Sequence, residues 1–404
     1  MPYRSFICEF CVSDRDLRAE LQERGKRLRH CPTCKSSNGK GLSVEDDRLR
    51  RILRALVRLN YSEWDYNHHI GGDSLQALMA RHDTIFNLSK HYSDYIPDEV
   101  WLPVDGDFGW YPESGDEISL GGGYYDGNVL WGIRDYDSDR VRGLVKRALE
   151  NNHFEVESDV ARLLESLRGD ISRTLTCGSE FYRARVGVQS RLTELVRLSP
   201  TDNSFLYQPY AEAKIGAPPL HLATEGRFNR ARVSILYLAS DVLTAVAEIR
   251  PHPGHLISTS KFRSTRTLEV ADFSNFDIRN FLSDDRLEQL RDILSIAAVL
   301  NVPVQPEHRY LYSVTQLFAD VIRTQGYDGI LFPSTVSKGE NLTCFTPGAF
   351  ELVDDSADVH EVAAVEYTIK KMPILEKHHV EHDYEKSEET PFATLLYGLA
   401  RREK

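Results

Sequence analysis

Hydrophobic residues recur every three to four positions in several stretches of the chain, which is the spacing of one face of an α-helix. In the clearest case the face is formed by Val44, Leu49, Ile52, Leu53 and Leu56. The same spacing predicts helices over residues 44–59, 73–92, 138–151, 156–175, 242–248, 284–300, 310–325 and 391–401. Residues 44–175 are therefore expected to be mainly helical.

From residue 181 onward the pattern adds short apolar or alternating stretches, which are typical of β-strands. Predicted strands cover residues 181–186, 234–239, 256–262, 267–272 and 329–332. Residues 199–226 hold four prolines and two glycines and are predicted to be loop. Residues 370–390 are charged and rich in histidine, which favours a solvated linker. Helices and strands thus mix in the second half, as in an α/β domain.

Composition indicates a folded globular protein. The chain has 404 residues, of which 41% are apolar and 27% charged. At about 150 residues per domain, this length predicts two or three domains. No stretch approaches the ~18 uninterrupted apolar residues of a membrane-spanning helix, and the first residues lack the apolar core of a signal peptide. We therefore expect a cytoplasmic protein with no membrane partner.

Four of the six cysteines lie near the start of the chain, in two Cys-x-x-Cys pairs formed by Cys8 with Cys11 and by Cys31 with Cys34. Two such pairs can supply the four thiolates of a tetrahedral zinc site. A site closed by four protein ligands is structural rather than catalytic. We therefore predict a zinc ribbon over residues 1–42. The alternatives are two disulfides or unrelated thiols, and His30 is a rival ligand.

Charge is unevenly distributed. Residues 1–60 carry a surplus of six basic residues, whereas the rest of the chain carries a surplus of 18 acidic ones. Basic side chains surround the cysteine pairs at Arg24, Lys26, Arg27, Arg29, Lys35 and Lys40. Part of this charge offsets the about −2 of a zinc tetrathiolate. Contact of the ribbon with nucleic acid stays an open alternative.

Two further signals are predicted to carry no function. His68 and His69 are adjacent, so on a helix they face different directions and do not share one metal ion. The glycines at 121–123 lack the Lys-Ser/Thr of a phosphate-binding loop, and we predict a turn there.

A series of short motifs follows in the second half. In chain order they are Phe181-Tyr-Arg-Ala-Arg185, Gly226-Arg-Phe-Asn229, Leu236-Tyr-Leu-Ala239, Ala245-Val-Ala-Glu248, Phe332-Pro-Ser-Thr335, Asn341 and Phe345. Glu248 stands out because it lies in an otherwise apolar segment, where an unpartnered buried carboxylate costs several kcal/mol. Arginines supply such partners, so Glu248 belongs either to a catalytic site or to a buried structural salt bridge.

Together and in this order, the motifs resemble the RES domain over about residues 178–355. The block before them resembles the HEPN-like region found ahead of some RES domains. It holds no arginine followed after four residues by a histidine, which is the ribonuclease motif, so ribonuclease activity is not expected. We predict an α+β protein with a zinc ribbon at 1–42, a helical HEPN-like domain at 43–175, a RES domain at 176–368 and a charged tail with a short helix at 369–404.

The resemblance implies an ADP-ribosyltransferase-like fold and an activity that degrades NAD+, as in bacterial toxins of toxin–antitoxin or defence systems. Carried over by motif, it assigns catalytic roles to Glu248, Arg183, Tyr237 and Ser334. It assigns NAD+ binding to Arg183, Arg227, Tyr237, Ser334 and Asn341. Phe228 replaces the usual tryptophan of the family, and Ser337 is a rival for the serine role.

These residue types suit cleavage of the nicotinamide–ribose bond. A carboxylate stabilises the oxocarbenium-like transition state, and guanidinium groups match the pyrophosphate oxygens. The predicted enzyme is an NAD+ glycohydrolase or phosphorylase. The alternatives are an ADP-ribosyltransferase acting on a protein, or a binding protein whose RES-like part is inert. Expected partners are NAD+ and an antitoxin or trigger recognised by the N-terminal domains, whereas a homodimer stays open.

Overall fold

The structure is a computed structural model. It describes residues 6–60, 63–65, 79–80, 83–92, 96–97, 118–120, 138–193, 205–283, 286–302, 304, 306–371 and 374. It divides the chain into two compact units. The first unit contains Met1–Tyr136 and Asp277–Arg291, and the second contains Asp137–Phe276 and Asp292–Lys404. Within the described residues, no helix is long and apolar enough to cross a membrane.

Several predicted features lie outside the described residues. These are the terminal helix at 391–401, the adjacent histidines at 68–69, the glycines at 121–123, most of the linker at 370–390 and most of the helix at 73–92. Of that last helix, residues 79–80 are helical, whereas 83–92 form turns and an isolated bridge.

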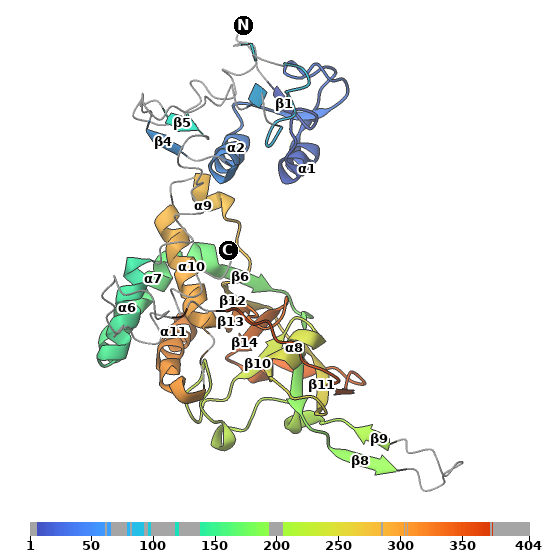
Figure 1. Ribbon diagram of the computed structural model, residues 1–404, viewed down its shortest axis with the longest axis vertical. Helices are drawn as coiled ribbons and strands as arrows, with labels where there is room; N and C mark the ends of the chain where they lie inside the picture. The colour runs from blue at the N-terminus through green and yellow to red at the C-terminus, as the bar shows by residue number, and fades with distance from the viewer. Residues whose placement is uncertain are drawn as a thin grey trace. The chain divides into compact units, whose positions relative to one another are not determined.

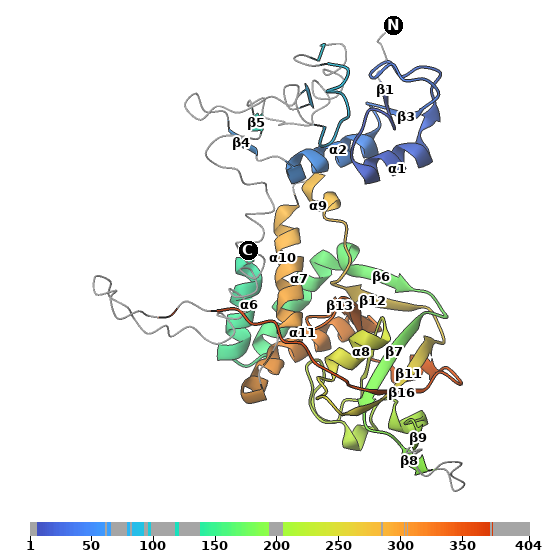
Figure 2. The ribbon, with the colours of Figure 1, turned by 45° about the vertical axis from the view of Figure 1, so that its right-hand side comes forward.

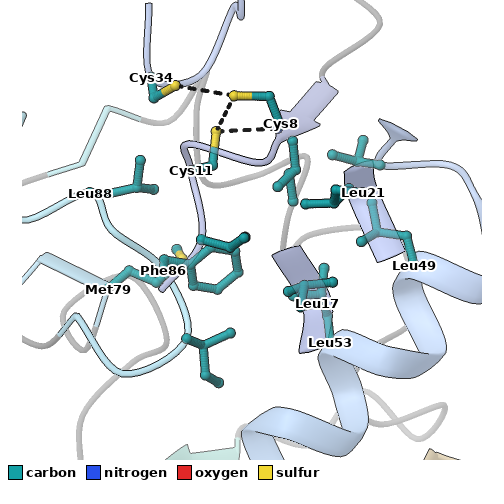
Figure 3. Close-up of a cluster of buried hydrophobic side chains, with 14 of the residues drawn as sticks. Cys8, Cys11, Leu17, Leu21, Cys34, Leu49, Leu53, Met79, Phe86 and Leu88 are labelled. Atoms are coloured by element: carbon teal, nitrogen blue, oxygen red, sulfur yellow. Dashed lines mark hydrogen bonds between the residues drawn. The ribbon is translucent and has the colours of Figure 1, made fainter. Parts of the chain in front are cut away.

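The first unit is built around a small antiparallel sheet with the order β1-β3-β2. Its elements are β1 (Phe6–Cys8), α1 (Arg15–Arg24), β2 (Lys26–Arg27), β3 (Lys40–Ser43), α2 (Asp47–Asn60), β4 (Glu63–Asp65), β5 (Ile118–Leu120) and α9 (Arg279–Ser283). Figure 1 labels β1, α1 and α2 of this unit. The predicted helix at 44–59 is confirmed as α2. Leu17 and Leu21 of α1 and Leu49 and Leu53 of α2 are fully buried in one core, as Figure 3 shows.

The second unit contains a nine-stranded sheet with the order β15-β11-β7-β10-β14-β13-β12-β6, in which β16 also pairs with β11. Its strands are β6 (Ser172–Leu175), β7 (Glu180–Val186), β10 (Leu236–Ala239), β11 (Leu256–Ser264), β12 (Leu268–Asp272), β13 (Gly329–Pro333), β14 (Glu340–Cys344), β15 (Phe350–Leu352) and β16 (Asp358–Glu361). β12 and β13 pair in parallel, whereas the other described strand pairs of this sheet are antiparallel. The predicted α+β class is confirmed.

Short elements connect these strands. β8 (Ser190–Thr193) and β9 (Phe205–Gln208) form a separate hairpin. The sequence predicted loop where β9 lies, because the four-residue strand sits among prolines. The short 3₁₀ turns of this unit are η1 (Glu212–Lys214), η2 (Leu220–Leu222), η3 (Pro306–Leu311) and η4 (Pro347–Ala349).

The second unit also contains the helices α6 (Asp139–Glu150), α7 (Phe154–Ile171), α8 (Val242–Glu248) and α11 (Tyr312–Thr324). Helix α10 (Leu287–Asn301) begins in the first unit and continues in the second. Figure 2 shows α6, α7 and α11 together, and these three pack on one another. The helix predicted at 156–175 ends at Ile171 because residues 172–175 pair with β12 as strand β6. The predicted helical domain at 43–175 stays a prediction, and α6 and α7 lie in the second unit.

α8 packs against β7, β10, β11 and β14. Small side chains make this close approach possible, since Ala184, Ala239 and Ala245 form a buried cluster with Ile257. Asp241 caps the helix by accepting a hydrogen bond from the Thr244 amide at 2.8 Å. The helix therefore starts at a defined residue and delivers its last residue, Glu248, to the edge of β14.

Candidate active site

A cavity lies beside the point where strands β7 and β10 of the large sheet meet. β7 pairs with β11 at seven successive positions, and β10 pairs with β14 at four. β7 and β10 form a ladder pair only at Ala239 and Tyr182. A cavity of about 480 Å³ is lined by residues of both strands, a volume within the range of ~300–1,000 Å³ usual for ligand pockets.

The structure brings the predicted site residues together. Five of them, Arg183, Arg227, Tyr237, Glu248 and Asn341, line this cavity. Ser334 does not line it, but its hydroxyl donates a hydrogen bond to Glu248 at 2.7 Å. All six predicted residues therefore belong to one site.

Hydrogen bonds within the loop that carries Arg227, and between this loop and Tyr237, fix the conformation of the loop. The Gly226 amide donates to the Asn229 carbonyl at 2.9 Å, and the Tyr237 hydroxyl donates to Asn229 Oδ1 at 2.8 Å. The same hydroxyl accepts from the Phe228 amide at 3.2 Å. A Cβ on Gly226 would lie 2.6 Å from Asn229 Oδ1, so only glycine fits there. Burial raises the pKa of Tyr237 to about 12, so at neutral pH its hydroxyl remains a donor.

Helix α11 holds the other side of this loop. The Gln316 side-chain amide donates to the carbonyls of Gly226 and Asn229 at 2.9 and 3.1 Å, and the Thr315 hydroxyl donates to the Arg227 carbonyl. Phe228 is buried and packs edge-to-face on Phe332, with 5.0 Å between the ring centroids. The backbone of Arg227 is therefore fixed while its side chain reaches the cavity.

Both arginines present positive charge without a carboxylate partner. Arg183 Nη1 donates to the Tyr237 carbonyl at 2.9 Å, whereas its buried Nε has no partner. Arg227 Nη1 donates to the Leu300 carbonyl at 3.1 Å. Within the described residues, neither forms an ion pair. Burial lowers the pKa of Arg183 to about 10 and also lowers that of Arg227, which Glu248 partly raises. An anionic ligand would stabilise both cations.

Glu248 is oriented by neutral donors. The Ser334 hydroxyl and the Asn341 side-chain amide both donate to Glu248 Oε1 at 2.7 Å. Glu248 is exposed, and within the described residues it forms no ion pair. The alternative of a buried salt bridge with arginine is therefore wrong, because Glu248 is exposed and, among the described residues, no arginine lies within ion-pair distance of it. Oε2 is left to accept a hydrogen bond from a ligand.

The structure distinguishes the two candidate serines. Ser334 Oγ accepts from the amides of Val336 and Ser337 at 3.2 and 3.1 Å while it donates to Glu248. The Ser337 hydroxyl instead accepts from Thr244 at 2.9 Å. Ser334 is thus the serine that meets the glutamate, and its hydroxyl is occupied by Glu248 rather than directed at open space.

Sequence reasoning missed two residues that line the cavity, Arg250 and Tyr312. Arg250 follows Glu248 by two positions, and a basic side chain so close to the glutamate motif is a signal that the sequence does contain. Tyr312 is the first residue of α11, and no sequence pattern near it indicates that this helix lies beside the motifs.

The four N-terminal cysteines also converge. Their sulfurs all lie within 4.8 Å of one another, with 3.7 Å between Cys8 and Cys11, 3.5 Å between Cys8 and Cys34, and 3.6 Å between Cys11 and Cys31. A zinc ion with Zn–S bonds of about 2.3 Å holds tetrahedral sulfurs ~3.8 Å apart, so the spacing fits this metal. Figure 3 shows Cys8, Cys11 and Cys34 drawn together above the apolar core. His30 Nδ1 forms a hydrogen bond with the Ser37 hydroxyl at 2.9 Å, and His30 is not part of the cluster.

Comparison with known proteins agrees with the motifs. The sequence model of the RES domain matches residues 195–367. This segment of the chain belongs to the RES domain family. A solved structure, described as the crystal structure of the M. tuberculosis MbcT–MbcA toxin–antitoxin complex, is 13% identical, with a TM-score of 0.26 over 50% of this chain and 91% of its own. The comparison with curated proteins gave no match.

Proposed function

We propose that the RES domain binds NAD+ in the 480 Å³ cavity and cleaves its nicotinamide–ribose bond. The observation that carries this proposal is the pairing, in one cavity, of two arginines that lack a carboxylate partner with a glutamate held by two hydrogen bonds. Cations without a counter-charge favour an anionic ligand. An oriented carboxylate favours a reaction in which positive charge develops.

In the proposed reaction the nicotinamide leaves with the electron pair of the C–N bond, and the ribose C1′ becomes oxocarbenium-like. The Glu248 carboxylate stabilises this charge, and its Oε2 accepts a hydrogen bond from a ribose hydroxyl. Ser334 and Asn341 act as positioning residues, because both hold Glu248 Oε1. An acceptor oxygen then bonds to C1′ and loses its proton to solvent.

The arginines bind the charged end of the substrate. Arg183 and Arg227 are placed to meet pyrophosphate oxygens, whose negative charge offsets the cost of burying the guanidinium groups. The resemblance assigned Tyr237 a catalytic and NAD+-binding role. In the structure its hydroxyl secures the loop of Arg227, so we assign it the positioning of that loop.

The test is nicotinamide release from NAD+ by the purified full-length chain. Release in plain buffer identifies a glycohydrolase, acceleration by inorganic phosphate with ribose-1-phosphate product identifies a phosphorylase, and ADP-ribose attached to protein identifies a transferase. A folded, zinc-loaded protein that releases no nicotinamide under any of these conditions would leave only the binding-protein alternative. The expected role beside an antitoxin or in defence rests on the family resemblance alone.

We also propose that Cys8, Cys11, Cys31 and Cys34 hold one zinc ion. The sulfur spacing and the burial of all four side chains support it. Bound zinc would crosslink β1 to the turn at residues 31–34 and so stabilise the small sheet, without an open position for catalysis.

A further inference from the structure

Arg250 is a third cation on the cavity wall. It lines the cavity together with Arg183 and Arg227, and its side chain is exposed. Within the part of the chain that the structure describes, no carboxylate lies within ion-pair distance of it. Its amide donates to the Ala247 carbonyl at 3.0 Å, which ties the backbone to the end of α8.

The backbone of Arg250 is strained. Its φ is +47°, in the left-handed region that residues with a Cβ rarely adopt. The position is the first one after the C-cap Ile249, where helices commonly end on glycine for this reason. An arginine there is less stable than glycine would be, and strain of this kind is typical of functional positions.

The charges on the cavity wall are also unbalanced. Burial is the main cause of the lowered pKa of Arg227. Tyr312 and Glu248 raise this pKa, whereas the nearby charge of Arg250 lowers it. Among the described residues, the charged side chains that line the cavity are three arginines and Glu248, which leaves a net charge of +2. A dinucleotide pyrophosphate carries two negative charges and would neutralise it.

We propose that Arg250 is a substrate-binding residue that pairs with a phosphoryl oxygen of the dinucleotide, beside Arg227. This deepens the proposed function and rests on it for the identity of the substrate. The guanidinium contributes to binding rather than to the bond cleavage, because its charge has the wrong sign to stabilise an oxocarbenium ion.

The test compares Arg250→Gly with a matched control, Arg232→Gly. Arg232 is also exposed and has a left-handed φ of +67°, but it does not line the cavity. Glycine should raise the melting temperature at both positions, because it relieves the same backbone strain. Only Arg250→Gly should weaken binding of ADP-ribose, measured by calorimetry on the full-length chain, by about 10- to 100-fold.

The kinetic prediction is a higher KM for NAD+ with a nearly unchanged kcat, and Arg250→Lys should recover part of the affinity. Unchanged ADP-ribose affinity in Arg250→Gly would overturn the assignment, as would equal losses in both variants. Binding is measured without turnover. Weakened ADP-ribose binding in Arg250→Gly therefore supports the binding role of Arg250 even if the protein releases no nicotinamide. The lack of nicotinamide release would count against the proposed reaction alone.

Discussion

The carboxylate of Glu248 accepts two hydrogen bonds that do not require its charge, and this allows charge to be tested apart from structure. Glu248→Gln keeps the volume and a carbonyl oxygen for Ser334 and Asn341. It removes the negative charge that faces the developing cation, so we expect kcat to fall about 10²- to 10³-fold. The melting temperature should hardly change, because the side chain is exposed. Nicotinamide release and thermal unfolding are measured on the same sample.

The control for Glu248 is Glu351→Gln, an exposed glutamate on β15 away from the cavity. It should leave kcat unchanged. A well-folded Glu248→Gln variant with near wild-type turnover would remove Glu248 from the proposed mechanism. A loss of rate that follows a loss of folded protein would instead make it a structural residue.

Cys31 tests the zinc proposal. Cys31→Ser removes one of four buried ligands, so we expect the metal content to fall from one zinc per chain toward zero and the first compact unit to unfold. The second unit shares none of these ligands and should keep its own thermal transition. Cys177→Ser is the control, because that thiol is exposed and lies outside the cluster. Freshly reduced wild-type protein without zinc would contradict the proposal.

At the scale of elements, the connection between β13 and β14 decides where Ser334 lies. Gly339 approaches the start of α8 so closely that an added Cβ would overlap side-chain oxygens of Ser240, Asp241 and Thr244. Beside this contact, the Ser337 hydroxyl accepts a hydrogen bond from the Thr244 hydroxyl. The absence of a side chain at 339 therefore lets the connection close on α8 and bring Ser334 to Glu248.

Gly339→Ala should push this connection away from α8 and weaken the contact between Ser334 and Glu248. We expect kcat to fall at least about tenfold, because a misplacement near 1 Å at a reacting group has that effect or more. Gly348→Ala is the matched control, since its Cβ would meet nothing within 4 Å. Equal activity in the two variants would show that the connection does not position the site.

At the scale of the whole molecule, the two units predict how the chain can be shortened. Val160, Leu163, Leu164 and Leu167 of α7 are fully buried in the second unit, and β6 pairs with β12. Burial of four such side chains contributes on the order of 6 kcal/mol or more, which is comparable with the ~5–15 kcal/mol stability of a typical domain.

A chain of residues 137–404 should therefore fold, whereas a chain of residues 176–404 should not, although 176 is the predicted start of the RES domain. Circular dichroism and thermal unfolding of the two fragments measure this. A cooperative transition in 176–404 equal to that in 137–404 would show that α7 and β6 are dispensable.

The sequence by itself determined the elements whose signal is local. The residues of α8 are those predicted, and α2, β7 and β13 lie within a few residues of their predicted limits, because apolar periodicity reports which face of an element is buried. The two Cys-x-x-Cys pairs were sufficient to predict the cysteine cluster, since each pair is a tight turn. The motifs and their order were sufficient to predict the RES domain, and the match to the family model confirms this prediction.

Only the tertiary structure decided how these pieces meet. Ser334 and Glu248 are 86 residues apart, and their contact depends on a glycine that lets one connection close on a helix end. The cavity beside the point where β7 and β10 meet, and the strained Arg250 on its wall, arise from non-local strand pairing and helix packing. Periodicity carries no information on such partners, because it records burial along one segment and not which distant segment provides it.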